Sequence, residues 1–113
     1  MKILLTGIDG YIGTVLAQEL IKAGHDVVGL DTGYYSEAWL YDIPNFRKPE
    51  VIVKDIRDVN KEDLIGFDAV VHLAELSNDP VGENNPDVTY KINHEGTVRL
   101  ATLAKEAGVK RFI

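Results

Sequence analysis

The stretch KILLTGIDGYIGTVLAQELIKAG, residues Lys2–Gly24, decides how the rest of the chain folds. Its first residues, Ile3–Leu5, form a short apolar run that is typical of a buried parallel strand. Three glycines follow at a spacing of three residues, and apolar residues then recur at helical intervals until Gly24. A strand that passes through a glycine-rich turn into a helix predicts the opening of a βαβ unit.

The glycine turn is a candidate anion site. Backbone N–H groups at a helix N-terminus are unpaired, and the helix dipole favours a negative charge there, so the turn predicts a cradle for a dinucleotide pyrophosphate. Gly7 would permit the tight turn, Gly10 would let the phosphates approach the backbone, and Gly13 would let the helix press against the strand. The expected donors are the amides of Tyr11 and Ile12. Three turn glycines that bind nothing are the competing interpretation, which the flanking strand and helix disfavour.

The second predicted strand, His25–Asp31, ends in a candidate ribose-binding acid. Asp31 lies 18 residues beyond Gly13, about where a dinucleotide fold places the carboxylate that accepts both adenosine-ribose hydroxyls. A carboxylate there repels a 2′-phosphate, and the following residues, Thr32 and Gly33, offer no arginine to receive one. The sequence therefore predicts NAD and not NADP as the cofactor. The alternative is a solvated acid at the end of a strand.

Residues Thr32–Pro49 form a long connection in which Ser36 is a candidate cap for helical turns over Glu37–Tyr41. The segment is rich in aromatic residues, which are Tyr34, Tyr35, Trp39, Tyr41 and Phe46. These rings could contact the adenine or a substrate domain, as alternatives to packing on the sheet edge. We expect these rings to pack, because aromatic clusters are most often buried surface.

Two further strands are predicted at Val51–Lys54 and Ala69–Leu73, and the ligand crevice of such sheets lies at the carboxyl ends of the strands. Asp55 and the Ile56 amide are therefore candidate adenine contacts, with a simple turn aspartate equally open on physical grounds. The fourth strand enters the crevice at Ala74 and Glu75. A short helix capped by Asn60 is expected between the two strands, and His72 is expected to be a packed core histidine.

A longer helix is predicted from Asn85 as cap and Pro86 as first residue to a close at Gly108. Gly96 within it predicts close packing against a neighbour. A fifth strand begins at Val109, and no helix pattern follows it. The element order predicts an α/β fold, a Rossmann-type doubly wound parallel sheet of about five strands in the order 3-2-1-4-5. We expect a chain truncated at the fifth strand, which exposes apolar surface and associates into a homo-oligomer.

The amino-acid composition and the net charge exclude several classes of site and partner. The 113 residues suit one domain, and the 45% apolar and 27% charged fractions are those of an ordinary globular protein. With no cysteine, disulfides and thiolate metal sites are excluded, and no metal site is predicted. The net charge of −6 disfavours non-specific nucleic-acid binding. Without a signal peptide or a membrane-length apolar run, a cytoplasmic protein with no membrane contact is expected.

Taken together, these motifs resemble the amino-terminal part of an extended short-chain dehydrogenase/reductase, in the NAD-dependent epimerase/dehydratase family that acts on nucleotide sugars. TGIDGYIG is similar to that family's TGxxGxxG signature, Asp31 to its ribose-binding acid, and DIRD to its adenine-contacting segment, which favours the adenine role of Asp55 and Ile56. VVHLAE resembles the family's HLAA strand end, which implies that Leu73, Ala74 and Glu75 line the pyrophosphate and nicotinamide ribose. NHEGT resembles its helical Asn-x-x-Gly-Thr, which implies that Asn93 supports the active-site backbone.

Two features depart from the family pattern. Glu75 stands where a second alanine is usual, and a carboxylate beside a pyrophosphate is repelled unless it faces solvent or a cation. The catalytic Tyr-x-x-x-Lys is missing, because no tyrosine is followed by a lysine four residues later. The resemblance implies that residues 1–113 are the amino-terminal part of an NAD-binding domain, without the catalytic Tyr-Lys region and the substrate-binding domain.

The implied function is the NAD-binding portion of a nucleotide-sugar epimerase or dehydratase that transfers hydride at a sugar hydroxyl, with this chain inactive alone. A non-catalytic dinucleotide-binding sensor and a self-associating minimal Rossmann fragment are the alternatives.

Overall fold

A five-stranded parallel sheet forms the centre of the computed structural model, which describes residues 1–37, 39, 48–77 and 84–113. The strand order is β3-β2-β1-β4-β5, and every neighbouring pair is parallel. The strands are β1 (Lys2–Thr6), β2 (Asp26–Asp31), β3 (Val51–Val53), β4 (Ala69–His72) and β5 (Arg111–Phe112). The predicted Rossmann-type sheet and its 3-2-1-4-5 order are confirmed.

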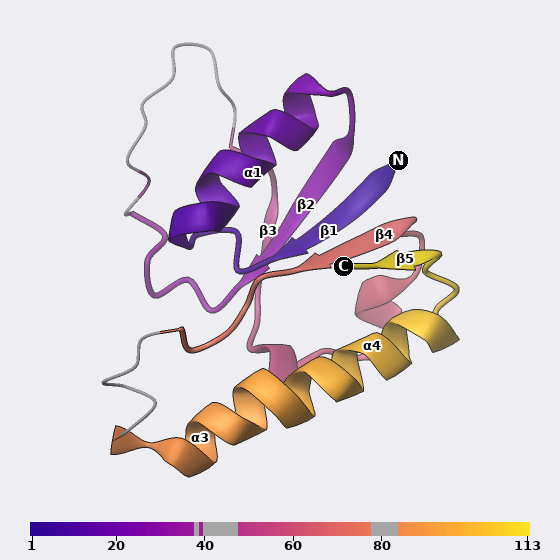
Figure 1. Cartoon of the computed structure of the whole chain (residues 1–113). Helices are drawn as coiled ribbons and strands as arrows, with labels where there is room; N and C mark the ends of the chain where they lie inside the picture. Colours follow the sequence, from indigo (N-terminus) through magenta and orange to yellow (C-terminus); the bar gives the residue numbers. More distant parts are fainter. Residues whose placement is uncertain (38, 40–47, 78–83) are drawn as a thin grey trace.

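Helices cover the two faces of this sheet, as Figure 1 shows. Helix α1 (Tyr11–Lys22) lies on one face, and α3 (Pro86–Tyr90) and α4 (Thr97–Glu106) lie on the other. Two short 3-10 turns, η1 (Ile56–Asp58) and η2 (Lys61–Leu64), pack beside α4. As predicted, Asn60 begins η2, where its backbone N–H donates to Asp63 Oδ2 at 2.8 Å.

Adjacent leucines of β1 supply the two halves of the core. Leu4 and Leu5 are both fully buried, Leu4 in the cluster beneath α4 and Leu5 in the cluster beneath α1. Successive strand residues point to opposite faces, so a central strand with helices on both faces must be apolar throughout. The run Ile3–Leu5 that predicted a buried strand follows from this requirement.

The helix predicted from Pro86 to Gly108 is present, but its hydrogen-bonding pattern changes within it. A π-helical segment, η3 (Lys91–Gly96), joins α3 to α4, and apolar spacing did not predict it. The predicted cap is wrong in one respect, because the Asn85 side chain makes no capping hydrogen bond within the described chain. Instead, the Asn85 carbonyl accepts hydrogen bonds from the backbone N–H and the hydroxyl of Thr89, each at 3.0 Å.

The close packing predicted at Gly96 is confirmed. A Cβ there would lie 2.9 Å from Ile56 Cδ1, so the helix packs closely on η1 and a larger residue would require the Ile56 side chain to shift. The aromatic connection after β2 is only partly as predicted. Trp39 packs against the α1-side core, but Tyr34 and Tyr35 are 83% and 68% exposed, because they lie in a turn beyond the end of β2. The predicted helical turns after Ser36, and the rings of Tyr41 and Phe46, lie largely or wholly outside the described residues.

Within the described parts of the chain, no helix combines the length and the apolar character needed to cross a bilayer.

Candidate dinucleotide site

The glycine turn joins β1 to α1 with very little free space around it. Gly7 has a φ of +70°, and a Cβ on it would lie 2.9 Å from the Ala74 backbone nitrogen. A Cβ on Gly13 would lie only 2.2 Å from the Gly7 carbonyl oxygen. These contacts support the tight turn predicted at Gly7. They also support close packing of the helix at Gly13, although the helix packs there against the turn that follows β1 and not against the strand itself. At Gly10 a Cβ would lie 3.1 Å from the same oxygen, and its approach to phosphates stays a prediction.

The first turn of α1 presents free backbone donors. Among the described residues, none accepts a hydrogen bond from the backbone N–H of Tyr11 or Ile12. Both side chains are turned outward, with exposed fractions of 83% and 62%. An open helix N-terminus of this kind attracts anions through its unpaired N–H groups and the helix dipole. The geometry therefore fits the anion cradle that the glycine spacing predicted.

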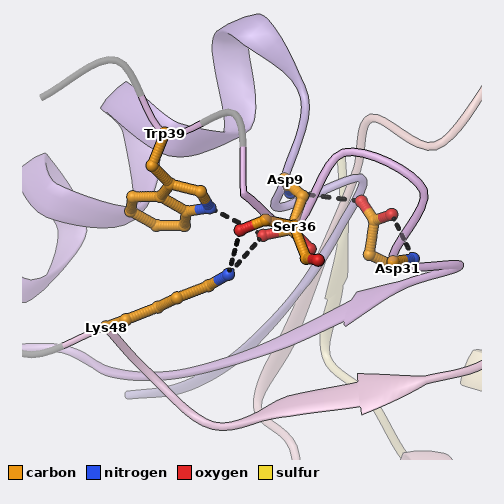
Figure 2. Close-up of polar contacts among 6 residues, drawn as sticks. Asp9, Asp31, Ser36, Trp39 and Lys48 are labelled. Atoms are coloured by element: carbon orange, nitrogen blue, oxygen red, sulfur yellow. Dashed lines mark hydrogen bonds and ion pairs between the residues drawn. The ribbon is translucent and has the colours of Figure 1, made fainter.

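Asp31 lies against this turn, at the carboxyl end of β2 (Figure 2). Its Oδ2 accepts a hydrogen bond from the backbone N–H of Asp9 at 3.1 Å, and its Oδ1 accepts one from Gly33 at 3.0 Å. Each carboxylate oxygen has two acceptor positions, so both retain one for a hydroxyl group. The structure thus places the predicted ribose-binding acid directly beside the predicted phosphate-binding turn.

The end of β4 is held to the same turn by the Thr6 side chain. Thr6 Oγ1 accepts hydrogen bonds from the backbone N–H groups of Leu73 and Ala74, both at 3.2 Å. The two predicted lining residues therefore adjoin Gly7, whose missing Cβ leaves room for their backbone. Glu75, by contrast, is exposed to solvent, which keeps its carboxylate hydrated.

His72 links three elements through both nitrogens of its ring. Nδ1 lies 2.7 Å from Thr6 Oγ1, and Nε2 lies 2.9 Å from Thr97 Oγ1. The Thr97 hydroxyl donates its proton to the Asn93 carbonyl, so it must accept from His72, whose Nε2 carries the proton. Nδ1 then accepts from Thr6. The ring is neutral in this network, and burial lowers the pKa of His72 from its ordinary value.

Asn93, in η3, holds the chain just after β4. Its Oδ1 accepts from the Leu76 backbone N–H at 2.8 Å, and its Nδ2 donates to the Leu76 carbonyl at 3.0 Å. Both polar groups of one peptide residue are thereby satisfied by one side chain. The supporting role that the resemblance implied for Asn93 agrees with this contact, and π-helical turns are frequent at functional sites.

Asp55 and Ile56 are not joined to the turn by the contacts of the described residues. Asp55 caps η1 and forms a two-pronged ion pair with Arg57, from Nε to Oδ1 at 3.0 Å and from Nη2 to Oδ2 at 2.7 Å. The guanidinium holds the pKa of Asp55 below its ordinary value. The Ile56 backbone N–H has no acceptor among the described residues, so the predicted adenine contact at that amide stays a prediction.

Sequence reasoning missed two residues at this site, Asp9 and Lys48, and it did not predict that Trp39 would hydrogen-bond to one of them. The Asp9 carboxylate accepts a hydrogen bond from Trp39 Nε1 at 2.7 Å and forms an ion pair with Lys48 at 2.8 Å (Figure 2). The one available signal was a charged residue inside the glycine motif, which requires a partner if it is buried. Nothing in the local pattern identified Lys48, which lies 39 residues farther along the chain.

Comparison with known proteins identifies a family that has this type of site. Residues 3–113 match the sequence model of a family described as the NAD dependent epimerase/dehydratase family. A UDP-glucose 4-epimerase of Mycolicibacterium smegmatis is 34% identical over 117 residues, covering 100% of this chain and 37% of that protein. One from Klebsiella pneumoniae is 34% identical over 122 residues, covering 100% of this chain and 86% of that protein.

Solved structures give the same result. The crystal structure of a dTDP-glucose 4,6-dehydratase from Streptomyces venezuelae, which has NAD bound, superposes with a TM-score of 0.84 at 30% identity. The match covers 99% of this chain and 38% of the dehydratase. The chain thus spans little more than a third of that protein and of the Mycolicibacterium epimerase.

Proposed function

Because this chain belongs to the NAD-dependent epimerase/dehydratase family, we propose that it is the amino-terminal, NAD-binding part of an enzyme that modifies nucleotide sugars. The observation that carries the proposal is the open N-terminus of α1 beside Asp31. Unpaired amides at Tyr11 and Ile12 suit a diphosphate, and the carboxylate of Asp31 suits the two hydroxyls of a ribose.

The known activities of the relatives support a nucleotide-sugar substrate. They include UDP-glucose 4-epimerases and a dTDP-glucose 4,6-dehydratase. In such a reaction NAD supplies the acceptor for a hydride taken from a sugar carbon. The residues of this chain bind and orient the cofactor, with Leu73 and Ala74 on its nicotinamide side and Asn93 fixing the backbone beyond them. No Tyr-x-x-x-Lys occurs in this sequence, so the proposal assigns these residues cofactor binding and not proton transfer.

Calorimetric titration of the purified protein with NAD and with NADP tests the proposal. We expect wild-type protein to bind NAD more tightly than NADP, because Asp31 repels a 2′-phosphate. Replacing Asp31 by Asn should weaken NAD binding and reduce the preference. Asp26→Asn is a matched control, since Asp26 is exposed at the opposite end of the same strand. Undetectable heats with both dinucleotides, or equal effects of the two substitutions, would contradict the assignment.

A further inference from the structure

A buried carboxylate stands inside the proposed phosphate-binding turn. Asp9 lies between Gly7 and Gly10, and its side chain is only 2% exposed. A negative charge at this place opposes the binding of a diphosphate, and burial strengthens the repulsion because little water screens it. On its own, therefore, Asp9 would make the turn a poor anion site.

The structure supplies the missing positive charge from a distant part of the chain. Lys48 Nζ lies 2.8 Å from Asp9 Oδ1, the oxygen that also accepts the Trp39 indole hydrogen bond. The same ammonium donates to the Ser36 carbonyl at 3.3 Å and lies 4.9 Å from the centre of the Trp39 ring. Figure 2 shows Lys48 reaching toward Asp9 and Ser36 from one side, with Asp31 on the other side of Asp9. These contacts fix the cation beside Asp9.

We propose that Lys48 determines dinucleotide affinity and specificity by cancelling the charge of Asp9 within the phosphate-binding turn. The inference rests on the proposed function and deepens it. Lys48 need not touch the cofactor for this effect. The affinity for the dinucleotide then depends on the summed charge of the side chains at positions 9 and 48, and it falls as that charge becomes more negative. Lys48→Met makes the turn one unit more negative, Asp9→Asn makes it one unit more positive, and the double variant is neutral, as the wild type is.

The Asp9–Lys48 pair also lies beside Asp31, the proposed ribose-binding acid. Its charge should therefore affect the preference between NAD and NADP. The Asp9 backbone N–H donates to Asp31 Oδ2 at 3.1 Å, so a charge change at Asp9 acts beside the expected position of the ribose hydroxyls. A 2′-phosphate adds close to two negative charges at neutral pH. Binding of NADP should consequently respond to the charge of the pair more strongly than binding of NAD does.

The test compares NAD and NADP affinities of purified wild type, Lys48→Met, Asp9→Asn and the double variant at low and at physiological ionic strength. We expect Lys48→Met to weaken NAD binding about tenfold and the double variant to return to within about threefold of wild type. Asp9→Asn should shift the NADP/NAD preference about tenfold toward NADP, an effect that salt reduces. Lys22→Met is the control for loss of a lysine, because Lys22 is 62% exposed and pairs with Glu19 on the surface of α1.

Several outcomes would overturn the inference. If Lys48→Met and the double variant are equally weak, Lys48 acts by direct contact or by holding its loop, and not through the Asp9 charge. Equal affinities in all variants would also overturn it. Thermal unfolding of each variant identifies a folding defect. Should Lys48→Met fail to fold, the remaining two variants still test the inference. Asp9→Asn should then bind the dinucleotide more tightly than wild type, and the double variant should bind it about as tightly as wild type. A wild type that binds neither dinucleotide contradicts the proposed function itself, and the inference with it.

Discussion

Replacing Gly13 by Ala tests the packing of the glycine turn without altering any polar group. The added Cβ would lie 2.2 Å from the Gly7 carbonyl oxygen and 2.8 Å from both Ile8 Cα and the Ile8 carbonyl oxygen. All three atoms belong to the backbone, so no side chain can rotate away and α1 must move. Overpacking costs up to about 3 kcal/mol, and alanine returns about 1 kcal/mol through its helix propensity. We expect a net loss of about 2 kcal/mol in the free energy of unfolding.

Gly96→Ala is the matched control, because this glycine also lies within a helix and is buried. Its nearest contacts would be Ile56 Cδ1 at 2.9 Å and the Lys91 carbonyl oxygen at 3.2 Å, so the atom that must shift most belongs to a side chain and not to the backbone. We expect it to stay within about 1 kcal/mol of wild type. For a chain of 113 residues, a loss of about 2 kcal/mol lowers the melting temperature by roughly 8 °C. Thermal and urea unfolding followed by circular dichroism measure both variants. Equal melting temperatures for the Gly13 variant and wild type, or equal losses in the two variants, would refute the reasoning.

Burial lowers the pKa of His72 below 6.5, so as pH falls through 6.5 the unfolded chain binds a proton first and stability is lost. Urea unfolding at about pH 7.5 and 5.5 should show that His72→Gln reduces this loss. An equal loss in wild type and His72→Gln would contradict the assignment. Asn93→Ala should speed amide hydrogen exchange at Leu76 by about tenfold, measured by NMR, because its N–H loses its acceptor. Leu100→Ala should cost about 2–5 kcal/mol in chemical unfolding, because this side chain is fully buried.

The sheet and the glycine turn were predictable from the sequence because each follows from a local requirement. Strands buried on both faces must be apolar, and Gly7 has a positive φ that other residues rarely adopt. The π-helical segment was not predictable, because it inserts one residue into the hydrogen-bond ladder while apolar spacing stays close to helical. The exposure of Tyr34 and Tyr35 was missed for a related reason, since composition alone does not say toward which side a turn projects.

The candidate site depends on contacts between residues that are far apart in the sequence. Local sequence patterns cannot predict such contacts. Asp31 and Ala74 were predicted from position in the chain, and Leu73 was implied by the family resemblance. What holds these residues beside the glycine turn is a set of hydrogen bonds between side chains and backbone, from the Asp9 N–H to Asp31 and from Leu73 and Ala74 to Thr6. The Asp9–Lys48 pair is the extreme case, because its partners lie 39 residues apart. A buried charge must find a partner somewhere in the fold. The glycine motif therefore predicts where an anion binds, and we propose that the charge at that position is balanced by Lys48, a residue outside the motif.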